Sequence, residues 1–143
     1  MVEVKTILFL FVIVLIVDRI NCGMNMAQFQ QMKGMLKSVC MPRSGVKAEA
    51  LAKLKDGEFP DDDRKLKCFF SCVLTTGQVM KGGKLNVESL RRQAGLLPAE
   101  VKGTTLETVE NCKNVEGADS CELSYAFIKC HYAISGRENF LFQ

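Results

Sequence analysis

The chain has 143 residues, the size of one small domain, of which 48% are hydrophobic and 24% are charged. Its formal net charge of +3 is small and is spread along the sequence, so the composition does not favour nucleic acid or an acidic membrane as a partner. The sequence contains no low-complexity tract and no internal repeat, so we expect one ordinary globular domain.

The first 22 residues have the layout of a secretory signal peptide. Lys5 precedes an apolar run at residues 7–17, and a candidate cleavage zone follows at residues 21–24. A short transmembrane anchor is the alternative, but this run is too short to span a bilayer stably. We therefore predict a signal peptide at residues 1–22, a mature domain at residues 23–143 and a secreted, extracellular protein. Cleavage there removes Cys22 and leaves six of the seven cysteines.

Two helices are expected at the start of the mature chain. Residues 24–39 carry apolar side chains at helical spacing, and Pro42 is predicted to end this helix. Residues 46–55 are rich in strong helix formers and are followed by the stop signal Asp56-Gly57. The apolar positions of the first helix are Phe29, Met32, Leu36 and Val39.

Residues 64–77 are predicted to form the central helix. Cys68 and Cys72 are four residues apart, so they project from the same side of this helix, one turn from each other. Its apolar side chains recur at i, i+3, i+4, i+7 and i+8, which gives the helix one apolar face. These side chains are Leu66, Phe69, Phe70, Val73 and Leu74.

The aspartates at residues 61–63 are expected to cap the central helix from the turn that precedes it. A calcium site is the alternative. We favour capping because these acids lack the alternating spacing and the terminal glutamate of a calcium loop.

Three more helices are expected at residues 87–94, 99–114 and 120–135. Asn86 is a suitable N-cap for the first, and Asp119 begins a capping-box-like pattern at the last. No segment shows the sustained alternation that a half-buried strand would need. The predicted fold class is all-α, with about six short helices.

The six mature cysteines follow the pattern Cys40-x27-Cys68-x3-Cys72-x39-Cys112-x8-Cys121-x8-Cys130. Six cysteines permit fifteen pairings, and spacing alone does not choose one. A bridge between Cys68 and Cys72 would close within one helical turn, which matches disulfide geometry poorly. Each of these two is therefore expected to reach a different helix.

This pattern, carried on helices after a signal peptide, closely resembles that of the insect odorant-binding proteins, the group that contains the pheromone-binding proteins. The specific part is the combination of Cys68-x3-Cys72 with Cys121-x8-Cys130. The resemblance covers nearly the whole mature chain, and Cys22 departs from it only if cleavage falls before that residue.

The resemblance implies three bridges around a closed apolar cavity inside a compact helical shell. In the chain-entropy model each bridge contributes roughly 3–4 kcal/mol to stability. The implied pairs are Cys40 with Cys72, Cys68 with Cys121, and Cys112 with Cys130.

The sequence offers no set of catalytic side chains, so we expect no enzyme activity and no cofactor. The single histidine, His131, has no neighbour resembling a triad partner and is interpreted as a partly exposed structural residue. Zinc is an alternative for the cysteines, but the x8 intervals and one histidine do not match common zinc sites, so no metal is predicted. A redox centre at Cys-x3-Cys is disfavoured because it lacks the CxxC spacing.

Apolar side chains are the expected ligand-binding groups. Several methionines are among them, and unbranched thioethers suit a cavity that accepts several shapes, although plain core filling is the alternative. The predicted lining is Phe29, Met32, Leu36, Phe70, Val73, Leu74, Val79, Met80, Leu90, Phe127, Ile134, Phe140 and Phe142. Tyr125, Tyr132 and Thr76 are the candidate polar anchors.

The C-terminal residues 139–143 are too few to form a stable helix alone, yet they include two phenylalanines and a leucine. The resemblance suggests that they fold across the cavity as a lid. Packing on the outside of a neighbouring helix is the alternative. Under the lid hypothesis, Glu138 and the terminal carboxylate hold the tail at neutral pH, and their protonation in acid loosens it.

The sequence therefore predicts a secreted carrier that binds small hydrophobic molecules, such as odorants, pheromones or similar lipophiles, in an internal cavity. The alternative is a secreted helical interaction protein or signalling ligand with a filled core and an exposed apolar patch. A membrane receptor is a further candidate partner. We expect no binding to nucleic acid, and a monomer or weak homodimer.

Overall fold

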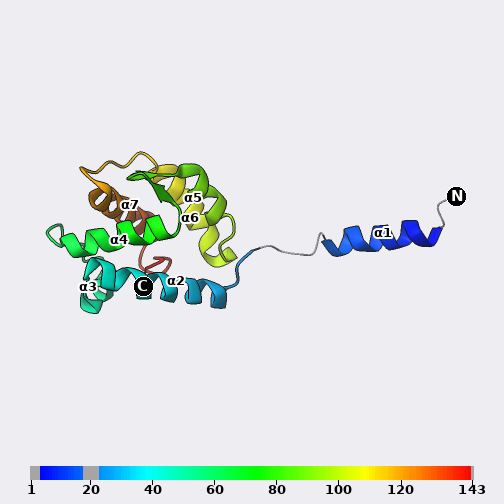
Figure 1. Cartoon of the computed structure of the whole chain (residues 1–143), viewed down its shortest axis with the longest axis horizontal. Coiled ribbons are helices and arrows are strands. Elements are labelled where there is room, and N and C mark those ends of the chain that lie inside the picture. The colour runs from blue at the N-terminus through cyan, green and yellow to red at the C-terminus, as the bar shows by residue number, and fades with distance from the viewer. Residues whose placement is uncertain (1–3, 18–22, 143) are drawn as a thin grey trace.

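The computed structural model describes residues 4–17 and 23–142, and Figure 1 shows their arrangement. The elements are α1 (Val4–Val17), α2 (Met26–Ser44), α3 (Ala48–Leu54), α4 (Arg64–Thr76), β1 (Met80–Lys81), β2 (Lys84–Leu85), α5 (Val87–Ala94), α6 (Ala99–Cys112) and α7 (Ser120–Ser135). The six helices expected after residue 22 are all present, which confirms the all-α fold class.

The helix α1 falls within the predicted signal peptide. Its side chains Val4, Leu8 and Phe9 are exposed. No helix among the described residues is both long and apolar enough to cross a bilayer. Cys22 and the predicted cleavage point lie outside the described residues.

The prediction that Pro42 ends the first helix is wrong, because α2 continues through it to Ser44. Proline lacks one backbone donor, but near the end of a helix this removes only one intrahelical hydrogen bond. The Ser44 hydroxyl donates to the carbonyl of Cys40 at 2.9 Å. The helix ends instead at Gly45, whose left-handed φ of 70° suits glycine.

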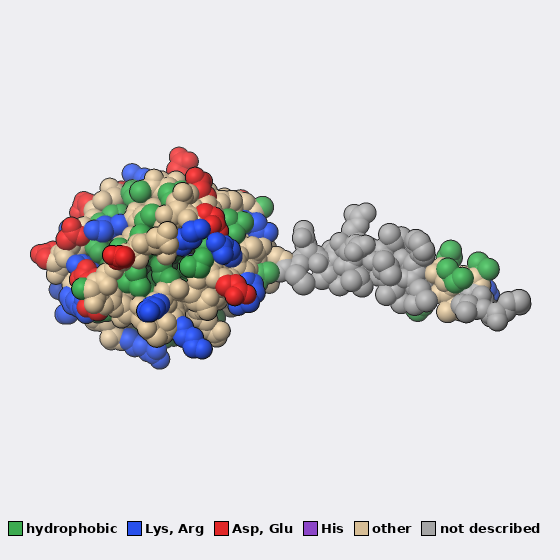
Figure 2. Space-filling view, turned by 90° about the horizontal axis from the view of Figure 1, so that it is seen from above, with side chains coloured by type: hydrophobic (Ala, Val, Ile, Leu, Met, Phe, Trp, Pro, Cys, Tyr) green, Lys and Arg blue, Asp and Glu red, His purple; other side chains and the backbone are tan. Residues whose placement is uncertain are grey.

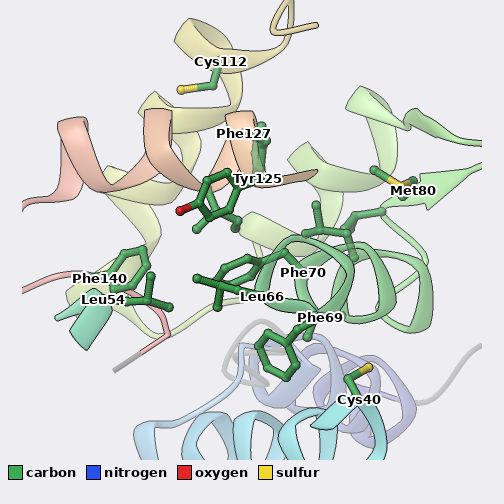
Figure 3. Close-up of a cluster of buried hydrophobic side chains, with 14 of the residues drawn as sticks. Cys40, Leu54, Leu66, Phe69, Phe70, Met80, Cys112, Tyr125, Phe127 and Phe140 are labelled. Carbon is green, nitrogen blue, oxygen red and sulfur yellow. The ribbon is translucent and has the colours of Figure 1, made fainter. Parts of the chain in front are cut away.

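The helix α4 packs against both α2 and α7 and carries much of the core (Figure 1). Its side chains Leu66 and Phe70 are fully buried, and they face Tyr125 of α7 (Figure 3). The side chain of Asp63 accepts from the backbone N–H of Leu66 at 2.9 Å, which confirms the predicted cap.

Charged pairs join α4 to α7 beside their common disulfide. Lys67 is only 8% exposed, and its ammonium donates to both carboxylate oxygens of Glu122 at 3.0 Å. The Arg64 guanidinium lies 2.9 Å from a carboxylate oxygen of Asp119 and holds the pKa of that carboxyl below its usual range. Glu122 therefore pairs with α4, and the side chain of Asp119 provides the N-cap of α7.

Three disulfides tie the helices together. Cys40–Cys72 joins α2 to α4, Cys68–Cys121 joins α4 to α7, and Cys112–Cys130 joins α6 to α7. Their Cα atoms are 5.6, 4.5 and 6.0 Å apart. These are the same pairs that the resemblance implies.

The short hairpin between α4 and α5 was not expected from the sequence. It pairs Met80 with Leu85 and Lys81 with Lys84, and two glycines with positive φ make its turn. Two residues per strand are too few to show an alternating pattern.

On the face shown in Figure 2, acidic and basic side chains are interspersed.

The loop before α7 depends on Gly117. A Cβ at this position would overlap the backbone of Leu123, whereas a Cβ at Gly103, inside α6, would meet no atom within 4 Å. We expect Gly117→Ala to lower the free energy of unfolding by about 1–3 kcal/mol, because the loop must shift away from α7.

The matched control is Gly103→Ala, which should raise that free energy by about 0.5–1 kcal/mol through higher helix propensity. Urea unfolding with the disulfides intact measures both. Equal stability of Gly117→Ala and the wild type would contradict the close approach of this loop to α7.

Candidate functional site

A mainly apolar pocket of about 140 Å³ lies between the helices and the C-terminal tail, and it is partly open to solvent. Five helices, the connecting loops and the tail contribute to it. Its lining is Phe29, Met32, Lys33, Leu36, Val73, Leu74, Gly77, Val79, Leu90, Gln93, Ala94, Leu97, Thr105, Thr108, Val109, Phe127, Ile128, His131, Leu141 and Phe142.

Most of the predicted apolar residues line this pocket. They come from α2, α4, α5, α7, the loop after α4 and the tail, so segments far apart in sequence meet here. These residues are Phe29, Met32, Leu36, Val73, Leu74, Val79, Leu90, Phe127 and Phe142.

Two predicted phenylalanines lie behind the pocket lining instead. Phe70 is fully buried, and its ring centroid is 5.2 Å from that of Phe142. Phe140 is 2% exposed, and its ring centroid is 5.7 Å from that of Phe142. Both rings therefore pack against Phe142 from the core side. Phe70 does so because the face of α4 that carries it is turned toward Tyr125 (Figure 3).

Met80 and Ile134 do not line the pocket either. The Met80 sulfur lies 3.6 Å from the hydroxyl of Ser124 and 3.9 Å from that of Ser71, which places it between α4 and α7. Ile134 is half-buried and packs against the core near the end of α7.

The three candidate polar anchors all lie outside the pocket. The Tyr125 hydroxyl donates to the carbonyl of Pro60 at 2.8 Å, and burial raises the pKa of Tyr125. The Tyr132 hydroxyl donates to the carbonyl of Lys55 at 3.3 Å. Thr76 is exposed, with its hydroxyl 3.8 Å from the Cys40 sulfur. Each therefore has a structural neighbour instead of a ligand.

The interpretation of His131 as partly exposed is wrong. Its side chain is 2% exposed, and burial lowers its pKa to about 4, so the imidazole is neutral at physiological pH. The physical reason is its position on α7, four residues after Phe127 and three after Ile128, which puts it on the same buried face. This spacing was visible in the sequence.

The hydrogen bonds around His131 assign its tautomer. The backbone N–H of Leu141 donates to Nε2 at 3.4 Å, so Nε2 is the acceptor. Nδ1 therefore carries the proton and faces the Thr108 hydroxyl at 2.9 Å. That hydroxyl donates in turn to the carbonyl of Thr104 at 2.9 Å.

The tail is built into the pocket. Leu141 and Phe142 line it, and the ring of Phe140 stacks on His131 with centroids 5.6 Å apart. Arg137, at the start of the tail, pairs with Asp56 at 2.9 Å. The Arg137–Asp56 ion pair, just before the tail, and the contacts with the neutral imidazole therefore both help to hold the path of the tail.

Lys33, Gln93 and Thr105 are further polar residues of the lining that sequence reasoning missed. Gln93 donates to the carbonyl of Gly77 at 2.7 Å, and Thr105 donates to that of Val101 at 2.8 Å. Within the described residues, no group of three or more histidine, cysteine or acidic side chains could hold a metal ion. The site is suited to enclosing an apolar molecule.

Comparison with known proteins identifies the family. The model of the PBP/GOBP family matches residues 22–133. General odorant-binding protein 72 of Anopheles gambiae is 31% identical over 108 residues, which cover 73% of this chain and 88% of that protein.

Two solved structures share the fold with a TM-score of 0.77. Odorant binding protein 5 of Apis mellifera is 26% identical, and the match covers 85% of this chain and 99% of that one. Odorant binding protein 4 of Chrysopa pallens is 30% identical, with 84% and 99% covered. The chain therefore belongs to the PBP/GOBP family of odorant-binding proteins.

Proposed function

We propose that this protein is a secreted carrier that holds a small hydrophobic molecule in the pocket between α2, α4, α5, α6, α7 and the tail. The observation that supports it most is the lining itself, which is largely aliphatic and aromatic and comes mainly from helices that disulfides tie together. Transfer of an apolar molecule from water to such a lining is favourable without any chemical reaction. A micromolar affinity requires about 8 kcal/mol.

Secretion is part of this proposal. The exposed apolar side chains of α1 cover no core, as expected of a segment that is removed. Three disulfides suit an oxidising compartment. A membrane receptor as a partner, and a monomer or weak homodimer, stay predictions.

The direct test is titration of residues 23–143, oxidised, with the neutral fluorescent probe N-phenyl-1-naphthylamine. We expect saturable binding at one site with a micromolar Kd. A second measurement, native mass spectrometry of protein purified from its source, should detect a co-purified small molecule. No saturable binding of the probe would leave the filled-core interaction protein as the better hypothesis.

Filling the pocket should weaken this binding. Ala94 lines it and is 3% exposed, so Ala94→Leu would place a larger side chain in the space that the ligand needs. We expect the probe Kd to rise at least about tenfold, with a stability cost of about 1–3 kcal/mol from overpacking. Ala52→Leu, on the exposed side of α3, is the matched control. Similar probe affinities for the two variants would place the probe elsewhere.

The tail should slow release. Phe142 lines the pocket in front of Phe70, so Phe142→Ala should open a path for the ligand and raise the off-rate measured by stopped-flow dilution about tenfold. Leu96→Ala removes an exposed apolar side chain and serves as the control. If Phe142→Ala changes neither the off-rate nor the Kd, the tail has only a packing role.

Acid should weaken the fold through His131. Its folded pKa of about 4 lies below the unfolded value of 6.5, so the unfolded state binds the additional proton between these pH values. The contribution of this group is therefore complete above pH 6.5 and is lost as the pH falls toward 4, by up to about 3 kcal/mol.

The only histidine of the chain is His131, so His131→Gln should flatten the dependence of unfolding free energy on pH between 6.5 and 4. Protonated Nε2 can no longer accept from the N–H of Leu141, so acid should also loosen the tail and release the probe in the wild type. We expect His131→Gln to reduce this acid-induced release. Identical pH profiles in the wild type and His131→Gln would contradict this role.

A further inference from the structure

Lys33 differs from the other polar side chains that line the pocket. The others each form a hydrogen bond with a neighbouring protein group; they are Gln93, Thr105, Thr108 and His131. Across residues 4–17 and 23–142, the ammonium of Lys33 has neither a hydrogen-bond acceptor nor a carboxylate within ion-pair distance. Instead it lies over the ring of Phe29, whose centroid is 5.3 Å from Nζ.

The position of Lys33 is at the edge of the pocket. A smaller pocket of about 40 Å³ adjoins the main one and shares Lys33, Leu36, Val73, Leu141 and Phe142 with it. Lys33 is half-buried where the two meet, and Lys37 lines only the smaller one and is exposed. The apolar space therefore opens beside two ammonium groups on successive turns of α2.

No acidic side chain of α2 balances these charges. The helix carries Lys33, Lys37 and Arg43 but neither aspartate nor glutamate. Burial and the charge of Lys37 both lower the pKa of Lys33, which is the effect expected of a cation without a counter-charge. A ring face attracts an ammonium group but does not neutralise it.

We propose that the ligand is an anionic amphiphile, in its simplest form a medium-chain carboxylic acid, whose carboxylate pairs with Lys33 while its apolar chain occupies the pocket. This inference rests on the carrier function proposed above and names the class of molecule carried. Because lysine presents a point charge on a flexible stem, it suits a single anionic group at the opening without strict geometry. The apolar interior then needs no polar partner for the rest of the molecule.

The test compares two ligands that differ only in their end group. Decanoate and 1-decanol displace N-phenyl-1-naphthylamine from the oxidised mature protein at pH 7.5, where decanoate is ionised. We expect Lys33→Met to weaken decanoate about tenfold and 1-decanol less than about twofold, since only the carboxylate loses its partner. Lys33→Arg should retain decanoate affinity within about threefold.

Lys37→Met is the matched control, because it removes an exposed lysine one turn away on the same helix. We expect it to weaken decanoate less than about threefold, through a charge that solvent screens. Equal losses for both ligands in Lys33→Met would mean that the side chain acts by packing, and would overturn the proposal. Unchanged decanoate affinity would overturn it as well.

The same titrations separate this proposal from the one on which it rests. If the neutral probe and 1-decanol bind the wild type but decanoate shows no dependence on Lys33, the carrier function stands and the ligand class is wrong. If the neutral probe fails to bind the wild type, the carrier function fails and this proposal fails with it.

Discussion

The central physical constraint is that α4 is covalently held from two sides while the space beside it stays partly empty. Cys40–Cys72 fixes it to α2, and Cys68–Cys121 fixes it to α7, where the partly buried ion pair of Lys67 and Glu122 reinforces the contact. Side chains that face an open pocket lose packing contacts that a filled core would supply. Cross-links offset that loss chiefly by restricting the unfolded chain, so they suit a fold that contains an open pocket.

The polar groups near the pocket follow from the same constraint. A buried polar atom without a partner would be costly, and the neutral imidazole of His131 meets this requirement through Thr108 and the N–H of Leu141. This network connects α6, α7 and the tail, so one titratable ring contacts both the interior of the pocket and the tail that lines it. Lys33 is the contrasting case, since it keeps its charge at the edge, where the aqueous phase and the apolar pocket meet.

Much of this architecture could be predicted from sequence, because its signals are local. The cysteine spacing indicated the family, and apolar periodicity, strong helix formers and capping residues together located all six helices of the mature chain. What failed depended on tertiary packing. Phe70 and Val73 both lie on the apolar side of α4, yet only Val73 reaches the pocket, and periodicity does not tell which neighbour each meets. Pro42 was wrongly predicted to end α2, because a helix end tolerates the loss of one hydrogen bond. His131 was wrongly predicted to be partly exposed, because the prediction left out its place on the buried face of α7.

The central claim is that an apolar ligand occupies the interior of the helical shell, and methyl NMR tests it most directly. In a titration of the oxidised mature protein with N-phenyl-1-naphthylamine, we expect saturable shifts of the methyl groups of Leu90, Val109 and Met32, which line the pocket. The methyl groups of Leu54, which is as fully buried as Val109 but does not line the pocket, should stay unchanged. Shifts confined to exposed methyl groups such as those of Met35 and Leu96 would contradict an internal site.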